Sequence, residues 1–371
     1  MNWMKQVVTT TVIGWCAASA QAQIKIGQTA GYTGIVAAGV KETADGAKLY
    51  LDMVNSRGGV HGQKIELLSL DDKFDPKLAQ ENARILIEEK NVLAMFLTRG
   101  TPHTEAILGL LDEHGVPLVG PSTGAMVLHQ PVKKYVFNVR ATYQLEAEKA
   151  IAYLHSMGVK RIALIQTDDS FGADGATGAL KGLAAAGLKP VLNEKFDRAK
   201  PDFSKMVVAM AAANAQAVMM IASGAAVAAG VSALRAAGTN AQIVTLSNNA
   251  SGGFVKGLNT HARGVLVSQV FPSERAVAIG FVKEAHDLMR AGDSAAELSP
   301  AMLEGFVAAK VLVEGLRRAG PAPSRLKLQA ALENMKKFDL GGVVISYSAD
   351  DHTGLNFVDL SIIGPDGKFK R

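Results

Sequence analysis

Residues 24–28, Ile-Lys-Ile-Gly-Gln, open the pattern that decides the fold, because a short β-branched run is followed by Ala-rich amphipathic and β-branched runs in turn. The alternation predicts helices at 40–55, 76–90 and 102–114, and strands at 65–70, 92–97 and 117–120. Asp75 is expected to cap the helix that Pro76 opens. Strands that alternate with helices in this way are typical of a parallel α/β sheet.

A second block with the same rhythm begins after Tyr143. It predicts helices at 145–157, 173–186, 203–213 and 225–237, and strands at 161–166, 190–196, 217–221, 242–246 and 264–269. Three helical stretches then follow with no strand between them, at 277–290, 300–318 and 325–335. This break indicates that the chain leaves the second sheet and returns to cover the first, so the last predicted strand, 359–363, needs a sheet to join.

The first 22 residues have the pattern of a cleaved export signal. Lys5 precedes an apolar run at 7–18, and Ala-Gln-Ala at 20–22 has the small-x-small form of a cleavage site. The run is shorter than the roughly 20 residues that a membrane-spanning helix needs. Cys16 lacks the preceding small residue of a lipoprotein signal. We therefore predict a soluble periplasmic protein that begins at Gln23.

Composition excludes several classes of function. Cys16 is the only cysteine, so the mature chain is expected to hold no disulfide, thiolate nucleophile or cysteine metal site. About 350 residues are too many for one core and indicate two domains. The formal charge of +5 falls to +4 without Lys5 and is spread along the chain, so no nucleic acid partner is expected. The eight histidines show no paired metal spacing, and we predict neither metal nor cofactor.

The loops that follow the predicted strands are the candidate ligand site, because open α/β sheets bind ligands at the carboxyl ends of their strands. These loops are rich in Gly, Ser, Thr and Asn, which offer backbone amides and hydroxyls to a small polar ligand. They are residues 31–39, 98–101, 121–124, 167–172, 223–226 and 247–253.

In order and spacing, these segments resemble the leucine/isoleucine/valine-binding protein family of transporter-associated receptors, over nearly the whole mature chain. The matches that carry the resemblance include Asn55-Ser56-Arg57-Gly58-Gly59-Val60-His61-Gly62, Gly115-Val116-Pro117-Leu118-Val119-Gly120-Pro121-Ser122, Val136-Phe137-Asn138-Val139-Arg140 and Asp168-Asp169-Ser170-Phe171-Gly172. Each match is weak alone, but together they are specific because they occur in register.

The resemblance implies an α/β type I periplasmic binding fold with two doubly wound parallel-sheet lobes. Three hinge crossovers would join the lobes, near Tyr143, Pro272 and Tyr347. After the signal peptide, 1–22, the N-terminal lobe would comprise 23–142 plus 273–346, and the C-terminal lobe 143–272 plus 347–371. The implied partners are a small-molecule ligand, enclosed by hinge closure, and an ABC permease at the inner membrane.

The family's site residues carry over to matching positions. Thr101 falls where a hydroxyl holds the ligand carboxylate, and Ser122, Thr123 and Gly124 fall where backbone and side chains cradle the carboxylate and α-amino group. Such donors suit a carboxylate, since charged acceptors make the stronger hydrogen bonds. The other expected ligand-binding residues are aromatic side chains and loop residues of the second block: Tyr32, Tyr143, Phe171, Ser223 and Asn249.

Two departures from amino-acid binders concern the ligand. Gly124 stands where those proteins have Thr, and Asn248 or Asn249 stands where they place a distal acid. Because a buried ammonium without an acidic partner is costly, a carboxylate without an α-ammonium, or a neutral polar compound, is the first hypothesis. A branched-chain amino acid is the second, and Glu146 would supply the missing charge. Gly39 replaces an aromatic lid, which leaves room for a bulky or aromatic ligand.

Other interpretations stand beside these. A sensory receptor of the same fold would bind its ligand in the same way. Gly120–Gly124 matches G-x-S-x-G, with Asp168 and His261 in hydrolase order, but Pro131 limits the helix that a Ser122 nucleophile needs, so we predict no enzyme. Thr101 can instead cap a helix, as can the Asp168-Asp169 pair. Tyr32, Tyr143 and Phe171 can instead be ordinary loop, hinge and core residues.

Overall fold

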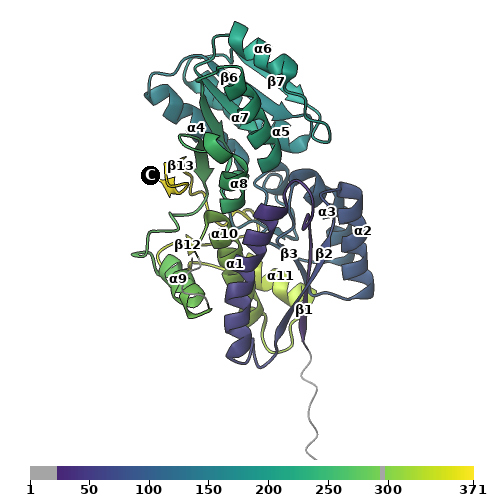
Figure 1. Cartoon of the computed structure of the whole chain (residues 1–371). Helices are drawn as coiled ribbons and strands as arrows, with labels where there is room; N and C mark the ends of the chain where they lie inside the picture. Colours follow the sequence, from purple (N-terminus) through teal and green to yellow (C-terminus); the bar gives the residue numbers. More distant parts are fainter. Residues whose placement is uncertain (1–22, 293–296) are drawn as a thin grey trace, which may run out of the picture.

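The computed structural model describes residues 23–292 and 297–371. The chain forms two α/β units, one above the other in Figure 1, and each is built on its own sheet. The predicted signal peptide, 1–22, lies outside the described residues. Within the described ranges, no helix is both long enough and apolar enough to cross a membrane.

The first sheet has five parallel strands in the order β2-β1-β3-β4-β5. Alternate side chains enter two cores: Phe96 and Val119 enter one, and Met95 and Leu118 enter the other. The strands are β1 (Ile24–Ala30), β2 (Ile65–Asp71), β3 (Ala94–Phe96), β4 (Leu118–Val119) and β5 (Val136–Phe137). Both faces are therefore covered, as an all-parallel sheet requires.

The helices of this unit divide between the two cores. Those that share a core with Phe96 are α1 (Ala37–Ser56), α9 (Gly280–Gly292), α10 (Pro300–Ala319) and α11 (Arg325–Glu333). Those on the Met95 side are α2 (Pro76–Arg84), its π-helical continuation η1 (Ile85–Glu89) and α3 (Thr101–His114). The predicted cap of α2 is present, because the Asp75 carboxylate accepts a hydrogen bond from the Lys77 amide at 2.8 Å.

The second sheet has seven strands in the order β14-β13-β10-β9-β8-β6-β7. The last two strands of the chain lie at one edge, where β13 runs antiparallel to β10. The strands are β6 (Ile162–Thr167), β7 (Leu192–Phe196), β8 (Ala217–Ile221), β9 (Gln242–Thr245), β10 (Leu266–Gln269), β13 (Asp359–Ile363) and β14 (Phe369–Lys370). One face packs on α4 (Tyr143–Ser156) and α5 (Ser170–Ala185), and the other on α6 (Ser204–Ala212), α7 (Gly224–Ala236) and α8 (Gly252–Gly257).

The chain passes between the two units three times, and the contacts of Tyr347 bear on where the third passage lies. The Tyr347 ring is buried in the core of the first unit and packs edge-on against Phe137. Its hydroxyl donates to the carbonyl of Asn138 at 2.9 Å, and Asn138 bridges to Thr353. We therefore propose that the first lobe extends to Val358, which still packs in this core.

Helices α1 and α10 approach each other closely because each has a glycine at the contact. A Cβ atom at Gly305 would overlap the carbonyl oxygen of Thr43. We expect Gly305→Ala to lower the free energy of unfolding by about 1–3 kcal/mol, since the packed helices would have to separate. Gly109→Ala is the control: it lies in α3 with open space around its Cβ, so we expect a gain of about 0.5–1 kcal/mol. Urea unfolding measures both, and a stabilising Gly305→Ala would contradict this packing.

Candidate functional site

Loops at the carboxyl ends of strands from both sheets meet between the two units. Four of the predicted site residues line one cavity of about 20 Å³ there: Thr101 follows β3, Tyr143 begins α4 after β5, Phe171 follows β6 and Ser223 follows β8. We call this space the strand-end cavity. An adjoining cavity of about 200 Å³ shares Val36, Arg99 and Asn248 with it and is otherwise lined mainly by Gly and Ala.

The two lobes touch across this cleft, so the structure is in a closed arrangement. Arg99 of the first lobe donates through Nη2 to the backbone carbonyl of Asn248 in the second, at 2.7 Å. The carboxylate of Glu42 accepts from the amides of Gly252 and Gly253 at 3.0 and 2.8 Å. These contacts hold the loops of both lobes against the same space.

Arg99 is the most informative side chain of the cleft. It follows β3, is only 7% exposed, and lines both cavities. Its other contact is a hydrogen bond from Nη1 to the hydroxyl of Ser122 at 2.8 Å. In the described part of the chain, no carboxylate lies within 4 Å of its guanidinium nitrogens. The cleft therefore carries a buried positive charge whose described partners are all neutral.

Two predicted hydroxyls pair with each other beside Arg99. Thr101 and Thr123 are buried, and their hydroxyl oxygens lie 2.8 Å apart. The alternative that Thr101 caps α3 is wrong, because Thr101 is itself the first residue of this helix and Gly100 takes the capping position without a side chain. The pair lies at the N-terminus of a 14-residue helix, where anions are favoured.

The apolar wall of the strand-end cavity is aromatic. The rings of Tyr143 and Phe171 meet edge to face at 4.9 Å. The guanidinium of Arg198 lies over the rings of Phe74 and Phe171, at 5.0 and 5.7 Å. Asp169 holds it there with a 2.5 Å hydrogen bond and also caps α5 through the Gly172 amide. Burial raises the pKa of Asp169, but Arg198, together with the hydrogen bonds from Gly172 and Thr167, outweighs burial and lowers that pKa below its ordinary value.

Five of the nine predicted ligand-binding residues do not line the strand-end cavity. Ser122 and Thr123 instead contact lining residues, Arg99 and Thr101, and the other three lie elsewhere. Tyr32 turns to β1, where its hydroxyl donates to Gln28 Oε1 at 2.6 Å. A Cβ atom at Gly124 would lie 2.6 Å from the carbonyl oxygen of Ala141, so this glycine allows close packing at the first crossover. Asn249 donates its amide to the Ala222 carbonyl and to Thr245, and it borders only the adjoining cavity. The neighbouring residue Asn248 lines the strand-end cavity, where Asn249 was expected.

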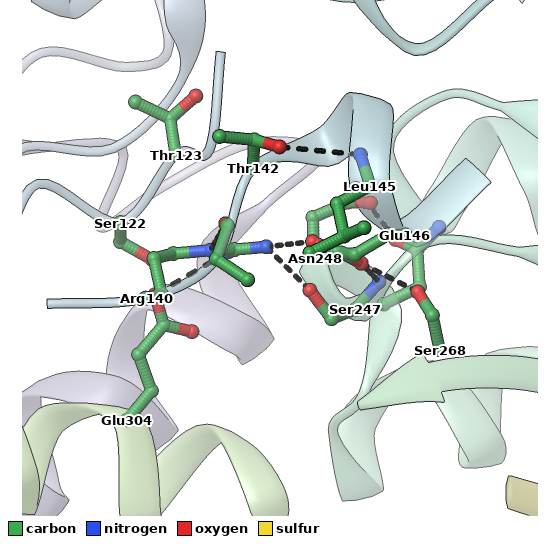
Figure 2. A network of polar contacts seen from close by, with 12 residues as sticks. Ser122, Thr123, Arg140, Thr142, Leu145, Glu146, Ser247, Asn248, Ser268 and Glu304 are labelled. Atoms are coloured by element: carbon green, nitrogen blue, oxygen red, sulfur yellow. Dashed lines mark hydrogen bonds and ion pairs between the residues drawn. The ribbon is translucent and has the colours of Figure 1, made fainter. Parts of the chain in front are cut away.

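Glu146 does not supply a negative charge to the cavity. It is fully buried between the lobes and accepts from the Ser247 amide at 2.9 Å and from the Ser268 hydroxyl at 2.5 Å (Figure 2). Arg140 donates to it through Nη2 at 2.5 Å and reaches Glu304 through Nη1 at 3.5 Å. The structure therefore gives no support to the hypothesis that Glu146 completes an ammonium pocket, because Glu146 lines neither cavity and Arg140 pairs with its charge.

Sequence reasoning missed Arg99, Arg198, Phe74 and Val36, which all line the strand-end cavity. Arg99 lies inside the 98–101 loop, so its position was visible, but an arginine is not among the residue types that the resemblance carries over. Arg198 follows β7, the edge strand of the second sheet, and its loop lies outside the predicted site loops. Arg198 and Phe74 come from different lobes and are neighbours in this closed arrangement.

Larger hollows occur elsewhere on the described surface, with volumes of about 1040 and 1060 Å³. The first is lined by charges of both signs from α1, α8 and α9, and the second by residues that include Gln23 at the edge of the described range. Neither shares a residue with the strand-end cavity. We place the candidate site at the strand-end cavity because buried polar groups from both lobes converge there.

The hydrolase alternative finds no support in the geometry. The Ser122 hydroxyl contacts Arg99, and in the described part of the chain no histidine bonds to it. Asp168 instead pairs with exposed Lys195 at 2.9 Å. Only the three-residue helix η2 (Met126–Leu128) follows Ser122, whereas a nucleophile elbow leads into a long helix. Among the described residues, no group of three or more His, Cys, Asp or Glu side chains could hold a metal ion.

Comparisons with known proteins agree with this architecture. The family described as "Periplasmic binding protein" matches residues 23–360. A substrate-binding periplasmic protein from Ralstonia solanacearum is 31% identical with a TM-score of 0.87, and the match covers 94% of this chain and 99% of that one. A possible leucine/isoleucine/valine-binding protein from Rhodopirellula baltica is 25% identical with a TM-score of 0.89, covering 96% and 98%.

A curated relative, Leu/Ile/Val-binding protein homolog 3 from Brucella melitensis, is 26% identical over 359 residues, which cover 94% of this chain and 93% of the relative. Several other curated relatives align over only about half of their own length. The family match spans both lobes and the residues that connect them. The chain belongs to the periplasmic binding protein family, with the type I fold of the leucine/isoleucine/valine-binding proteins.

Proposed function

We propose that this chain is the exported solute receptor of an ABC-type importer and binds a small carboxylate without an α-ammonium group. The observation that supports this most is Arg99, a buried guanidinium in the cleft whose described partners are all neutral. A ligand carboxylate would balance its charge and accept its hydrogen bonds. The Thr101–Thr123 hydroxyl pair and the N-terminus of α3 would add further donors.

The same surroundings disfavour an α-ammonium group. Within the described part of the chain, no acidic side chain lines the strand-end cavity or the adjoining cavity. Glu146 is engaged by Arg140, and Asp169 by Arg198. A buried ammonium would therefore face two arginines and no free carboxylate, which is costly.

Closure of the lobes would be the whole activity, with no chemical step. Arg99 and Thr101 come from the first lobe, whereas Phe171, Ser223 and Asn248 come from the second, so a ligand touches both sets only when the cleft is shut. Such a ligand shifts the population toward the closed form. The closed receptor would then dock on an inner-membrane permease, after export directed by residues 1–22.

Calorimetry of the purified chain against matched acids tests this proposal. The panel pairs leucine with 4-methylpentanoate and phenylalanine with 3-phenylpropanoate, and adds the 2-hydroxy acid of each skeleton. We expect at least one ammonium-free acid to bind and its amino-acid counterpart to bind at least tenfold more weakly. If leucine bound more tightly than every ammonium-free acid, the proposal would be overturned. Leucine is the most informative amino acid to test, because the names of two relatives include it.

A further inference from the structure

The orientation of the Asn248 side-chain amide is fixed by its neighbours. Its Nδ2 donates to the carbonyl of Ala222 at 3.0 Å and to Oδ1 of Asn249 at 3.1 Å. The Asn249 amide is fixed in turn, because its own Nδ2 donates to Ala222 and to the Thr245 hydroxyl. Both hydrogens of Asn248 Nδ2 are therefore used, and its Oδ1 can only accept a hydrogen bond.

This acceptor is buried and has no hydrogen-bond partner among the described residues, and the same holds for the hydroxyl of Ser223. Ser223 is 3% exposed and precedes α7, yet its side chain does not cap that helix, although serine at this position commonly does. Both residues line the strand-end cavity together with Arg99. Buried polar atoms are nearly always paired, so two unpaired ones in one cavity point to groups that a ligand brings.

We propose that the ligand is a hydroxycarboxylate, whose hydroxyl is recognised by Asn248 Oδ1 and Ser223 Oγ. This inference rests on the proposed binding of a carboxylate at Arg99. A hydroxyl can donate to Asn248 and accept from Ser223 at once, which satisfies both atoms. An ammonium has no acceptor lone pair for Ser223 and would gain no counter-charge from a neutral amide.

The geometry also limits where the hydroxyl lies on the ligand. Arg99 contacts the backbone carbonyl of Asn248 at 2.7 Å, so the carboxylate anchor and the hydroxyl acceptor belong to neighbouring groups. The hydroxyl is therefore expected at the 2- or 3-position of the acid. Tyr143 and Phe171 offer apolar ring surface to the remainder of the molecule, which favours an apolar substituent.

The experiment compares 2-hydroxy-3-phenylpropanoate with 3-phenylpropanoate, and 2-hydroxy-4-methylpentanoate with 4-methylpentanoate, by calorimetry. We expect the wild-type chain to bind the hydroxy acid of at least one pair ten- to a hundredfold more tightly. Ser223→Ala is expected to reduce this preference severalfold, and Asn248→Leu to abolish it. Ser156→Ala, an exposed serine that bonds only to its own helix, should leave the preference unchanged. Thermal melts confirm that each variant folds.

Asn248→Asp provides a gain-of-function arm. A carboxylate at this position would give an ammonium its missing partner, so the variant should bind phenylalanine or leucine at least tenfold more tightly than the wild-type chain does. Equal wild-type affinity for hydroxy and deoxy acids would overturn the hydroxyl inference and leave carboxylate binding standing. Failure of every acid to bind would instead overturn the proposed function.

Discussion

Arg99→Met is expected to weaken the binding of the tightest carboxylate in the calorimetric panel by about a hundredfold or more, because it removes the charge that holds the ligand. The Arg99 guanidinium is buried, and among the described residues it meets only the Ser122 hydroxyl and the Asn248 carbonyl. Losing a desolvated charge-assisted pair costs more than losing a neutral hydrogen bond. Titration calorimetry of the variant measures the effect directly.

Two comparisons make the Arg99 result specific. Arg99→Lys keeps the charge but loses the planar fork that contacts Ser122 and Asn248 together, so we expect an intermediate loss. Arg84→Met removes an exposed arginine that pairs with Glu88 on the surface. This variant should bind the acid as tightly as the wild-type chain does. An Arg99→Met variant that folds and binds the acid as tightly as the wild-type chain would refute a carboxylate site at Arg99.

The largest effect on stability is expected from the ion pair between the lobes. Arg140 is 1% exposed and contacts both Glu146 and Glu304, at 2.5 and 3.5 Å (Figure 2). Burial lowers the pKa of Arg140, but Tyr143, Glu146 and Glu304 together raise it above its ordinary value, so the guanidinium stays charged. Arg140→Met would leave two buried carboxylates without the cation that they share, and we expect it to lower the free energy of unfolding by about 3–5 kcal/mol.

A surface ion pair gives the matched control for this prediction. Arg318 pairs with Glu314 one helical turn away, and its side chain is 33% exposed. Arg318→Met should cost less than about 1 kcal/mol, since water replaces the lost contact. Urea unfolding at neutral pH compares the two variants. If Arg140→Met cost no more than Arg318→Met, the interlobe cluster would not be the stabilising contact that its burial implies.

Most of the fold could be predicted from the sequence, because the elements depend on local patterns. The helix from Pro76 begins where Asp75 and Pro76 place it, and the long runs of alternating strands and helices appear in the predicted order. The pieces that were missed are short: α8 spans six residues, and β5, β11 (Phe338–Asp339), β12 (Val344–Ile345) and β14 span two residues each. Such strands have too few residues to show a period and exist only through their partners.

The position of the crossover predicted near Tyr347 could not be derived from local sequence patterns. Nothing local distinguishes a tyrosine in a connecting segment from one in a core. The structure places it against Phe137 and Asn138, more than 200 positions earlier in the chain, and this contact supports the proposed extension of the first lobe to Val358. Contacts of this kind depend on how distant segments are packed, which a single sequence does not show.

The sequence predicted which loops form the candidate site, but not the roles of the charged side chains in it. Thr101, Tyr143, Phe171 and Ser223 share one cavity because strand-end loops converge wherever two such sheets face each other. The roles of Arg99, Asn248 and Glu146 depend on where side chains point. Asn249 and Asn248 are adjacent, yet only Asn248 borders the strand-end cavity, and Glu146 turns to Arg140 rather than to the ligand space.

A crystal structure of the chain with its tightest-binding acid tests the central claim most directly. We predict that the acid lies between the strand ends of both lobes, with a carboxylate oxygen within hydrogen-bond distance of the Arg99 guanidinium. A carboxylate bound elsewhere, with Arg99 still bonded only to Ser122 and Asn248, would contradict this account.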